Sequence, residues 1–198
     1  MHGWDNFIVS PVRSRYDNTK KVGDKDLILN TEIFTHKNVS NNAIVVGLPK
    51  NKQTNIKIGD EVIIHHNVFR RWHDVRGKEQ NSSSFFSEDK YLVNDDQLYI
   101  YKNKDQWKSL DDYCFVKPIA NDDMFSLDKE KPLVGILKYS NDILKCAGLN
   151  VGDKVGFIPG SEFEFIIDGE RVYRVRTKAI TIKYEYEGKE REYNPSWL

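Results

Sequence analysis

Three histidines near the middle of the chain have the spacing that most resembles a metal site. His65 and His66 are adjacent, and His73 follows with Asp74 directly after it. Neighbouring residues of a strand point to opposite faces, so His65 and His66 would not share one ion. Zinc sites combine separated ligands with thiolates or carboxylates at recognisable spacing. We therefore predict surface histidines and no metal site.

Carboxylates and thiols are the other side chains in the sequence that could take part in catalysis. A general acid and a general base could come from the glutamates Glu162, Glu164 and Glu185, but nothing in the sequence selects a pair. The two cysteines, Cys114 and Cys146, are too few for a disulfide framework. The chain contains no nucleophile elbow, phosphate-binding loop or dinucleotide glycine pattern. We therefore expect a protein that is not an enzyme and that needs no cofactor.

The overall charge excludes further classes. Thirty Lys and Arg residues balance thirty Asp and Glu residues, whereas nucleic-acid binders usually carry a basic excess. No apolar run approaches the roughly 20 residues that span a bilayer, and the first residues lack a signal-peptide pattern. These features predict a cytoplasmic protein that binds neither nucleic acid nor membrane. The abundance of Lys, Asn, Asp and Tyr favours an AT-rich genome, such as that of a bacteriophage or its host.

An internal repeat organises the elements around these residues. Residues 5–11 match 112–118, residues 58–62 match 151–155, and residues 93–100 match 175–182. A weaker match pairs residues 43–47 with 136–140, which places both inner matches 93 residues apart. Apolar and polar residues alternate in these segments with the period of half-buried strands.

The repeat predicts an all-β chain made of two tandem small β-barrels. Copy one covers residues 1–103, with a long loop after its first strand and an insert at 70–89. Copy two covers 109–185 with a shorter loop, and 186–198 form a polar tail. The segment 103–110 is expected to be a linker. Asn141 to Ala147 is expected to form one helical turn that ends at Gly148.

The order of these segments resembles the GroES-type co-chaperonin family. Leu149-Asn150-Val151-Gly152-Asp153-Lys154-Val155-Gly156-Phe157 is similar to a stretch of that family, and residues 56–64 repeat it as Ile-Lys-Ile-Gly-Asp-Glu-Val-Ile-Ile. The resemblance covers most of both copies but not the linker, the insert or the tail. It implies two GroES-like barrels and a homo-oligomeric ring that caps a chaperonin (GroEL-type) ring with ATP bound to that partner.

The long loop of copy one carries the chaperonin-binding residues that the resemblance implies. Leu27, Ile28 and Leu29 form an isolated apolar triplet in a polar stretch, where the family has an apolar mobile-loop motif. Lys25 and Asp26 stand where the family has two glycines. A polar loop cannot bury enough surface to fold alone, whereas three apolar side chains can dock into a partner's groove. The alternative is that the triplet is an ordinary short strand of an enlarged barrel.

Copy two offers a weaker candidate in Met124, Phe125 and Leu127, which form either a second docking motif or a packed turn. Two other functions stay open at this point. The tandem barrels can instead serve as the scaffold of a structural or assembly protein, for example a viral one. A ribosome-associated barrel also uses Gly-Asp turns, but the neutral charge argues against it.

Overall fold

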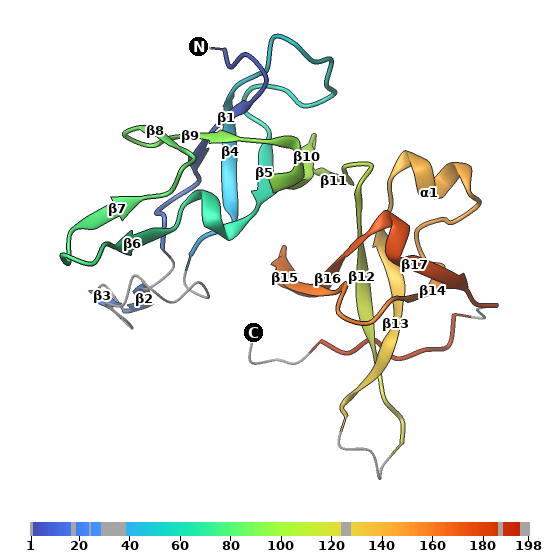
Figure 1. Cartoon of the computed structure of the whole chain (residues 1–198). Coiled ribbons are helices and arrows are strands. Elements are labelled where there is room, and N and C mark those ends of the chain that lie inside the picture. The colour runs from blue at the N-terminus through green and yellow to red at the C-terminus, as the bar shows by residue number, and fades with distance from the viewer. Residues whose placement is uncertain are drawn as a thin grey trace. The chain divides into compact units, whose positions relative to one another are not determined.

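The computed structural model describes residues 2–16, 19–23, 25–28, 39–123, 128–185 and 188–194. Strands are the main regular structure of these residues, as the sequence predicts (Figure 1). The chain divides into two compact units, Met1–Gln106 and Trp107–Leu198, which we call unit 1 and unit 2. No helix among the described residues has the length and apolar character to cross a membrane.

Unit 1 is built around a sheet of short strands. They are β1 (Phe7–Pro11), β4 (Asn42–Gly47), β5 (Glu61–Ile64), β8 (Phe85–Ser87), β9 (Lys90–Val93), β10 (Leu98–Asn103) and β11 (Gln106–Ser109), which pair in the order β11-β10-β5-β4-β1-β9-β8. The division between the units falls within β11. Two hairpins form sheets of their own: β2 (Thr19–Val22) with β3 (Lys25–Ile28), and β6 (Arg71–His73) with β7 (Glu79–Asn81). The short 3-10 helices η2 (His66–Val68) and η3 (Asp95–Gln97) precede β6 and β10.

Unit 2 contains one six-stranded sheet. Its strands are β12 (Tyr113–Ala120), β13 (Glu130–Tyr139), β14 (Lys154–Phe157), β15 (Phe163–Ile167), β16 (Glu170–Arg176) and β17 (Ile180–Lys183), in the order β15-β16-β12-β13-β14-β17. The helix α1 (Asp142–Cys146) follows β13, and the 3-10 helix η4 (Thr177–Ala179) precedes β17. A buried apolar cluster that includes Cys114, Leu137, Val155 and Val175 fills the core of this unit.

Six strands of each unit pair in the same order. The series β10-β5-β4-β1-β9-β8 corresponds to β17-β14-β13-β12-β16-β15. The irregularity between Ile8 and Val9 in β1 also recurs between Phe115 and Val116 in β12. Val9 pairs with Val45, and Val116 pairs with Leu137.

This pairing corrects the weakest sequence match by one residue. The sequence aligned Ala43 with Ile136, whereas the pairings with β5 and β14 make Gly135 the equivalent of Ala43. A one-residue slip turns every side chain of a strand to the other face. Short apolar runs such as Ile-Val-Val look alike in either register, so the local sequence did not distinguish them.

The Gly-Asp turn has the same geometry in both units. Gly59 and Gly152 both have φ of 94°, a conformation that favours glycine. Asp60 Oδ2 accepts a hydrogen bond from Lys57 N at 2.8 Å, and Asp153 Oδ2 accepts one from Asn150 N at the same distance. The glycine amides donate to Val45 O and Leu137 O, again at 2.8 Å in each case. The repeated sequence thus reproduces one turn that fastens the start of β5 or β14 to its neighbouring strand.

The described sheets are open, so the expectation of closed barrels is wrong at that level of detail. Strands β8 and β11 are the edges of the first sheet, and β15 and β17 are the edges of the second. Closure of a barrel depends on strand tilt and stagger across the whole sheet. Alternating residues predict that a strand is half-buried, but they carry no information on whether the edges meet.

The predicted linker contains structure. Lys104 and Asp105 have φ of 49° and 63°, as in a two-residue hairpin turn, and β11 follows at once. The described part of the predicted tail, residues 188–194, is hydrogen-bonded to the end of β12. Ala120 N donates to Arg191 O at 2.7 Å, and Tyr193 N donates to Pro118 O at 2.9 Å.

The predicted helical turn is confirmed as α1, and a buried asparagine holds it in place. Asn141 is fully buried and caps the helix, because its Oδ1 accepts a hydrogen bond from Leu144 N at 2.9 Å. Its Nδ2 donates to Tyr113 O at 2.7 Å and to Thr177 Oγ1 at 2.6 Å. One side chain therefore ties the end of β13 to the starts of β12 and η4.

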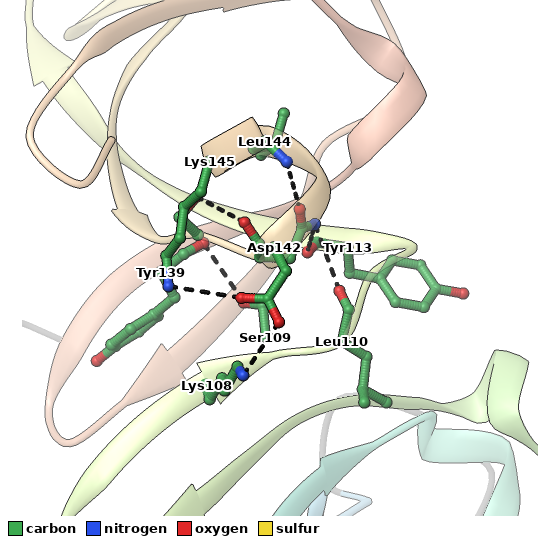
Figure 2. A network of polar contacts seen from close by, with 10 residues as sticks. Lys108, Ser109, Leu110, Tyr113, Tyr139, Asp142, Leu144 and Lys145 are labelled. Atoms are coloured by element: carbon green, nitrogen blue, oxygen red, sulfur yellow. Dashed lines mark hydrogen bonds and ion pairs between the residues drawn. The ribbon is translucent and has the colours of Figure 1, made fainter. Parts of the chain in front are cut away.

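The exposed side of α1 adds an ion pair to this network. Asp142 lies between Lys108 and Lys145 in Figure 2, with its Oδ2 3.2 Å from Lys108 Nζ. The hydrogen bond from Lys108 lowers the pKa of Asp142. A carboxylate in the first turn also suits the positive end of the helix.

Candidate functional site

The long loop of unit 1 leaves the sheet through a narrow neck. Tyr16 and Val39 form an antiparallel bridge, and Ser40 N donates to Arg15 O at 2.9 Å. Tyr16 and Val39 are 5% and 4% exposed. The chain that leaves the sheet and the chain that returns to it are therefore held together at this bridge. Of the residues between Tyr16 and Val39, the structure describes 19–23 and 25–28, and we call these residues the arm. We call the pair Tyr16 and Val39 the neck.

The neck is fastened to the insert at 70–89. Tyr16 Oη accepts a hydrogen bond from Arg71 N at 2.8 Å, and the Arg71 guanidinium lies over the Tyr16 ring at 4.9 Å. Arg15 donates to Phe69 O at 3.2 Å and to Asn81 Oδ1 at 2.9 Å. Burial lowers the pKa of Arg15, although guanidinium remains charged at any physiological pH. The base of the β6–β7 hairpin thus braces the base of the arm.

The first two residues of the predicted docking triplet lie on the arm. Leu27 and Ile28 belong to β3, and Leu29 lies outside the described residues. In the β2–β3 hairpin Lys20 pairs with Leu27 and Thr19 pairs with Ile28. The Leu27 side chain is 54% exposed. The triplet therefore begins in a strand, as the alternative interpretation expected, but this strand belongs to a separate two-stranded sheet and not to the main sheet.

The second candidate motif cannot be placed, because Met124, Phe125 and Leu127 lie outside the described residues. Its flanks are joined by Asn121, whose N donates to Lys129 O at 3.0 Å and whose Nδ2 donates to Asp128 O at 3.1 Å. The corresponding connection of unit 2, between β12 and β13, is thus held together by Asn121 directly beyond the ends of these strands.

The insert at 70–89 is a hairpin followed by an edge strand. Its tip is the turn at residues 74–78, where Val75 is fully exposed, whereas Ser84 is 7% exposed. Ser82 Oγ donates to Val68 O at 2.6 Å. Trp72 and Phe86 are exposed, and Phe69 packs edge-on against Tyr91 at 4.8 Å. Phe69 is therefore part of a local core beneath the insert, whereas Trp72 and Phe86 face solvent.

The candidate chemical groups do not assemble into a reactive centre. The rings of His65 and His66 stack at 4.4 Å, and His65 Nδ1 accepts from Asn67 N at the start of η2. No group of three or more metal-ligating side chains occurs among the described residues. Cys146 is exposed, while burial raises the pKa of Cys114 to about 12 and keeps that thiol protonated. Glu164 is bound to Arg171 at 3.1 Å, and it lines one cavity of unit 2 together with Glu162.

Sequence reasoning identified the arm but missed the residues that anchor it. Arg15 and Tyr16 stand at the edge of a polar stretch, and no local pattern marks them. Their partners, Phe69, Arg71 and Asn81, are more than 50 residues further along the chain. The only available signal was the coincidence of a long loop and an aromatic insert in the same copy.

Comparison with known proteins adds no assignment to this geometry. No protein-family model matches the chain, and no curated protein matches it.

Proposed function

We propose that the protein is a co-chaperonin that assembles into a ring and caps a chaperonin through the arm of unit 1. The observation that carries this proposal is the β2–β3 hairpin beyond the neck, which presents Leu27 half-exposed in a sheet of its own. This hairpin lies between β1 and β4, where the resembling family has its mobile loop.

The energetics suit reversible capping. A two-stranded hairpin alone is marginally stable in water, so the arm gains order when it docks. Burying one large apolar side chain contributes about 1.5–3 kcal/mol, and ordering the backbone costs about 1–2 kcal/mol per residue. A single arm therefore binds weakly. Several arms on one ring act at high effective concentration and give firm but reversible attachment.

The neck adds direction to this docking. Tyr16 and Arg15 fix the base of the arm to β6 and β7 through the contacts described above. A fixed base reduces the number of orientations that the arm samples, which lowers the entropic cost of binding. The β6–β7 hairpin thus supports the proposed function without contacting the partner.

The rival proposal is a structural or assembly protein that uses the two units as a scaffold. It is favoured by apolar side chains on equivalent edge strands, because β8 carries exposed Phe86 and β15 carries exposed Phe163 and Ile166. Exposed edges with apolar residues promote pairing between chains. A capping ring also needs self-association, so these edges alone do not separate the two proposals.

The Leu27→Asp substitution separates them. We expect the wild-type chain to form a complex with a purified GroEL-type ring when ATP is present, and the substitution to weaken this complex at least about tenfold. Native mass spectrometry with and without ATP measures both the complex and the free oligomer. The matched control is Val75→Asp, an equally drastic change at a fully exposed apolar site of the insert.

Two quantities decide the outcome, which are the amount of complex with the chaperonin and the size of the free oligomer. Loss of the complex with an unchanged free oligomer supports the co-chaperonin. If the wild-type chain self-assembles but ignores the chaperonin at every nucleotide condition, the scaffold proposal replaces it.

A further inference from the structure

A bulge in β13 sets unit 2 apart from unit 1. Pro118 pairs with Gly135 and Ala120 pairs with Glu130, so β13 uses three more residues than β12 between these two pairs. Within this bulge Leu133 has φ of 61°, a conformation that is strained for a bulky side chain. In unit 1 the pair Pro11 with Ala43 corresponds to Pro118 with Gly135, and β1 ends at Pro11, so the described strands of unit 1 have no counterpart of this bulge. Bulges and backbone strain of this kind gather at binding sites.

The bulge forms one wall of a cavity of about 470 Å³. Residues 128–134 line one side, β15 and β16 line another, and Phe157 and Tyr193 complete it. All of these residues belong to unit 2. The volume lies in the range of small-molecule sites.

Arg171, one of the cationic residues that line the cavity, is already paired within the protein. Arg171 donates to Glu130 Oε2 at 2.8 Å and to Glu164 Oε2 at 3.1 Å. Its guanidinium also lies over the rings of Tyr173 and Tyr193, at 5.0 and 5.6 Å. Arg171 is therefore neutralised on its edge and covered on its faces, so it does not recruit an anion.

Lys131 is used in the same way. Its Nζ lies 2.6 Å from Glu190 Oε2, and Glu190 also binds Lys154. These contacts lower the pKa of Glu190 and keep it ionised. The lysine at this wall of the cavity therefore has an internal partner.

Glu162 is a carboxylate at the cavity for which the described residues provide no ion pair. It lines the cavity, and no ion pair joins it to any lysine or arginine in the described part of the chain. Its Oε2 is buried and receives no hydrogen bond from the described residues. Buried carboxylate oxygens are nearly always hydrogen-bonded, because leaving them unpaired is costly. A ligand that complements this site must therefore bring a hydrogen-bond donor, and a positively charged donor forms the strongest bond of this kind to a carboxylate.

The remaining wall is apolar. Pro132, Leu133, Val134 and Phe157 line the cavity alongside Glu162. A hydrocarbon stem would pack against these side chains while an ammonium group meets the carboxylate. We infer that this cavity binds an alkylammonium group, which comes either from a free aliphatic diamine or from a lysine side chain of a protein. The inference is independent of the co-chaperonin proposal.

Chemical-shift titration of the full-length chain tests this inference. The probes are cadaverine as the free diamine and Nα-acetyl-lysine-methylamide as the lysyl side chain. We expect at least one of them to shift the amide resonances of Leu133, Glu162 and Tyr173, with an affinity in roughly the millimolar range. The tighter probe identifies the source of the ammonium group.

Glu162→Gln is expected to weaken binding by at least about tenfold, because it removes the charge and keeps the side-chain shape. The matched control is Glu88→Gln, an exposed glutamate of unit 1, which should leave the affinity unchanged. Pentan-1-ol, which has the stem without the charge, should bind at least about tenfold more weakly than cadaverine.

Three results overturn the inference. One is the absence of shifts at the cavity with both ammonium probes. Another is an affinity that Glu162→Gln leaves unaltered. The third is equal binding of pentan-1-ol, which would show that the cavity selects the stem and not the charge.

Discussion

Unit 1 and unit 2 arrange six strands in one order and differ in the connection that leaves the first strand. In unit 1 the chain passes through the neck of Tyr16 and Val39 and forms an arm. In unit 2 the excursion closes near Asn121, and the returning strand bulges at Leu133 around a cavity. The shared strands are a framework, and this connection gives each unit its candidate function. Connections accept such changes because they carry few buried contacts.

The two units also differ in electrostatics. Most ion pairs between described residues lie in unit 2, where Lys117 and Lys138 share Glu170, and Lys131 and Lys154 share Glu190. In unit 1 the corresponding contacts are fewer and include the pair of Arg71 with Glu79 at 2.9 Å. Unit 1 instead uses buried aromatic rings such as Phe69 and Tyr91 beneath its insert.

The largest expected effect comes from Asn141→Ala. This change removes the cap of α1 and leaves buried acceptors of Tyr113 and Thr177 without their donor. We expect unit 2 to lose about 2–4 kcal/mol of unfolding free energy, since a cap contributes about 1 kcal/mol and an unpaired buried group costs about 1–3 kcal/mol. Urea unfolding followed by NMR peak intensities for each unit measures the loss.

Asn51→Ala serves as the control for that substitution. Asn51 is exposed and donates to Asp5 Oδ1 at 2.7 Å, so a change within about 0.5 kcal/mol is expected. If Asn141→Ala destabilises unit 1 as much as unit 2, the two units unfold as one, and treating them as separate frameworks is wrong.

A smaller effect is expected from alanine at the two turn glycines. Gly59 and Gly152 share a φ of 94°, and a Cβ at either position meets no atom within 4 Å. The cost is therefore conformational, about 1–2 kcal/mol, and should be the same in both units to within about 0.5 kcal/mol. Thermal or urea unfolding of the two single variants checks this equality. A glycine that tolerates alanine without loss would show that the two turns are not equivalent.

The smallest effect is expected from acid. The ion pairs with Lys131 and Lys154 lower the pKa of Glu190, and those with Lys138 and Lys117 lower the pKa of Glu170. Their stabilisation is fully present above the unfolded pKa of about 4.3 and is lost as the pH falls through the lowered folded values. Unit 2 should therefore lose stability more steeply than unit 1 below about pH 4.

Urea midpoints of each unit between neutral pH and acid test this difference. Glu190→Gln should flatten the acid response of unit 2, because the variant has no carboxylate to protonate at that position. An equally steep loss in unit 1 would contradict the electrostatic contrast between the units.

Local patterns were sufficient for most of the strands in the repeated segments, the Gly-Asp turns and the helical turn at Asn141. They missed the short 3-10 helices η3 and η4, which interrupt the segments 93–100 and 175–182. Period-two alternation identifies a half-buried strand, and a glycine between β-branched residues identifies a tight turn. The same patterns failed where the answer depended on distant residues. They placed the second strand one residue out of register and implied closed barrels. They also treated residues 103–110 as a linker, because the local sequence contains no turn pattern that predicts the hairpin at Lys104 and Asp105.

The site divides in the same way. An apolar triplet in a polar stretch is visible in the sequence, so Leu27, Ile28 and Leu29 stand out without a structure. The neck and the cavity are not visible, since Tyr16 meets Arg71 and Arg171 meets Glu130 across long separations in the chain. Short-range composition specifies backbone conformation through sterics and burial. The contact partners of each charged or aromatic side chain are determined only when strand pairing brings remote segments of the chain together.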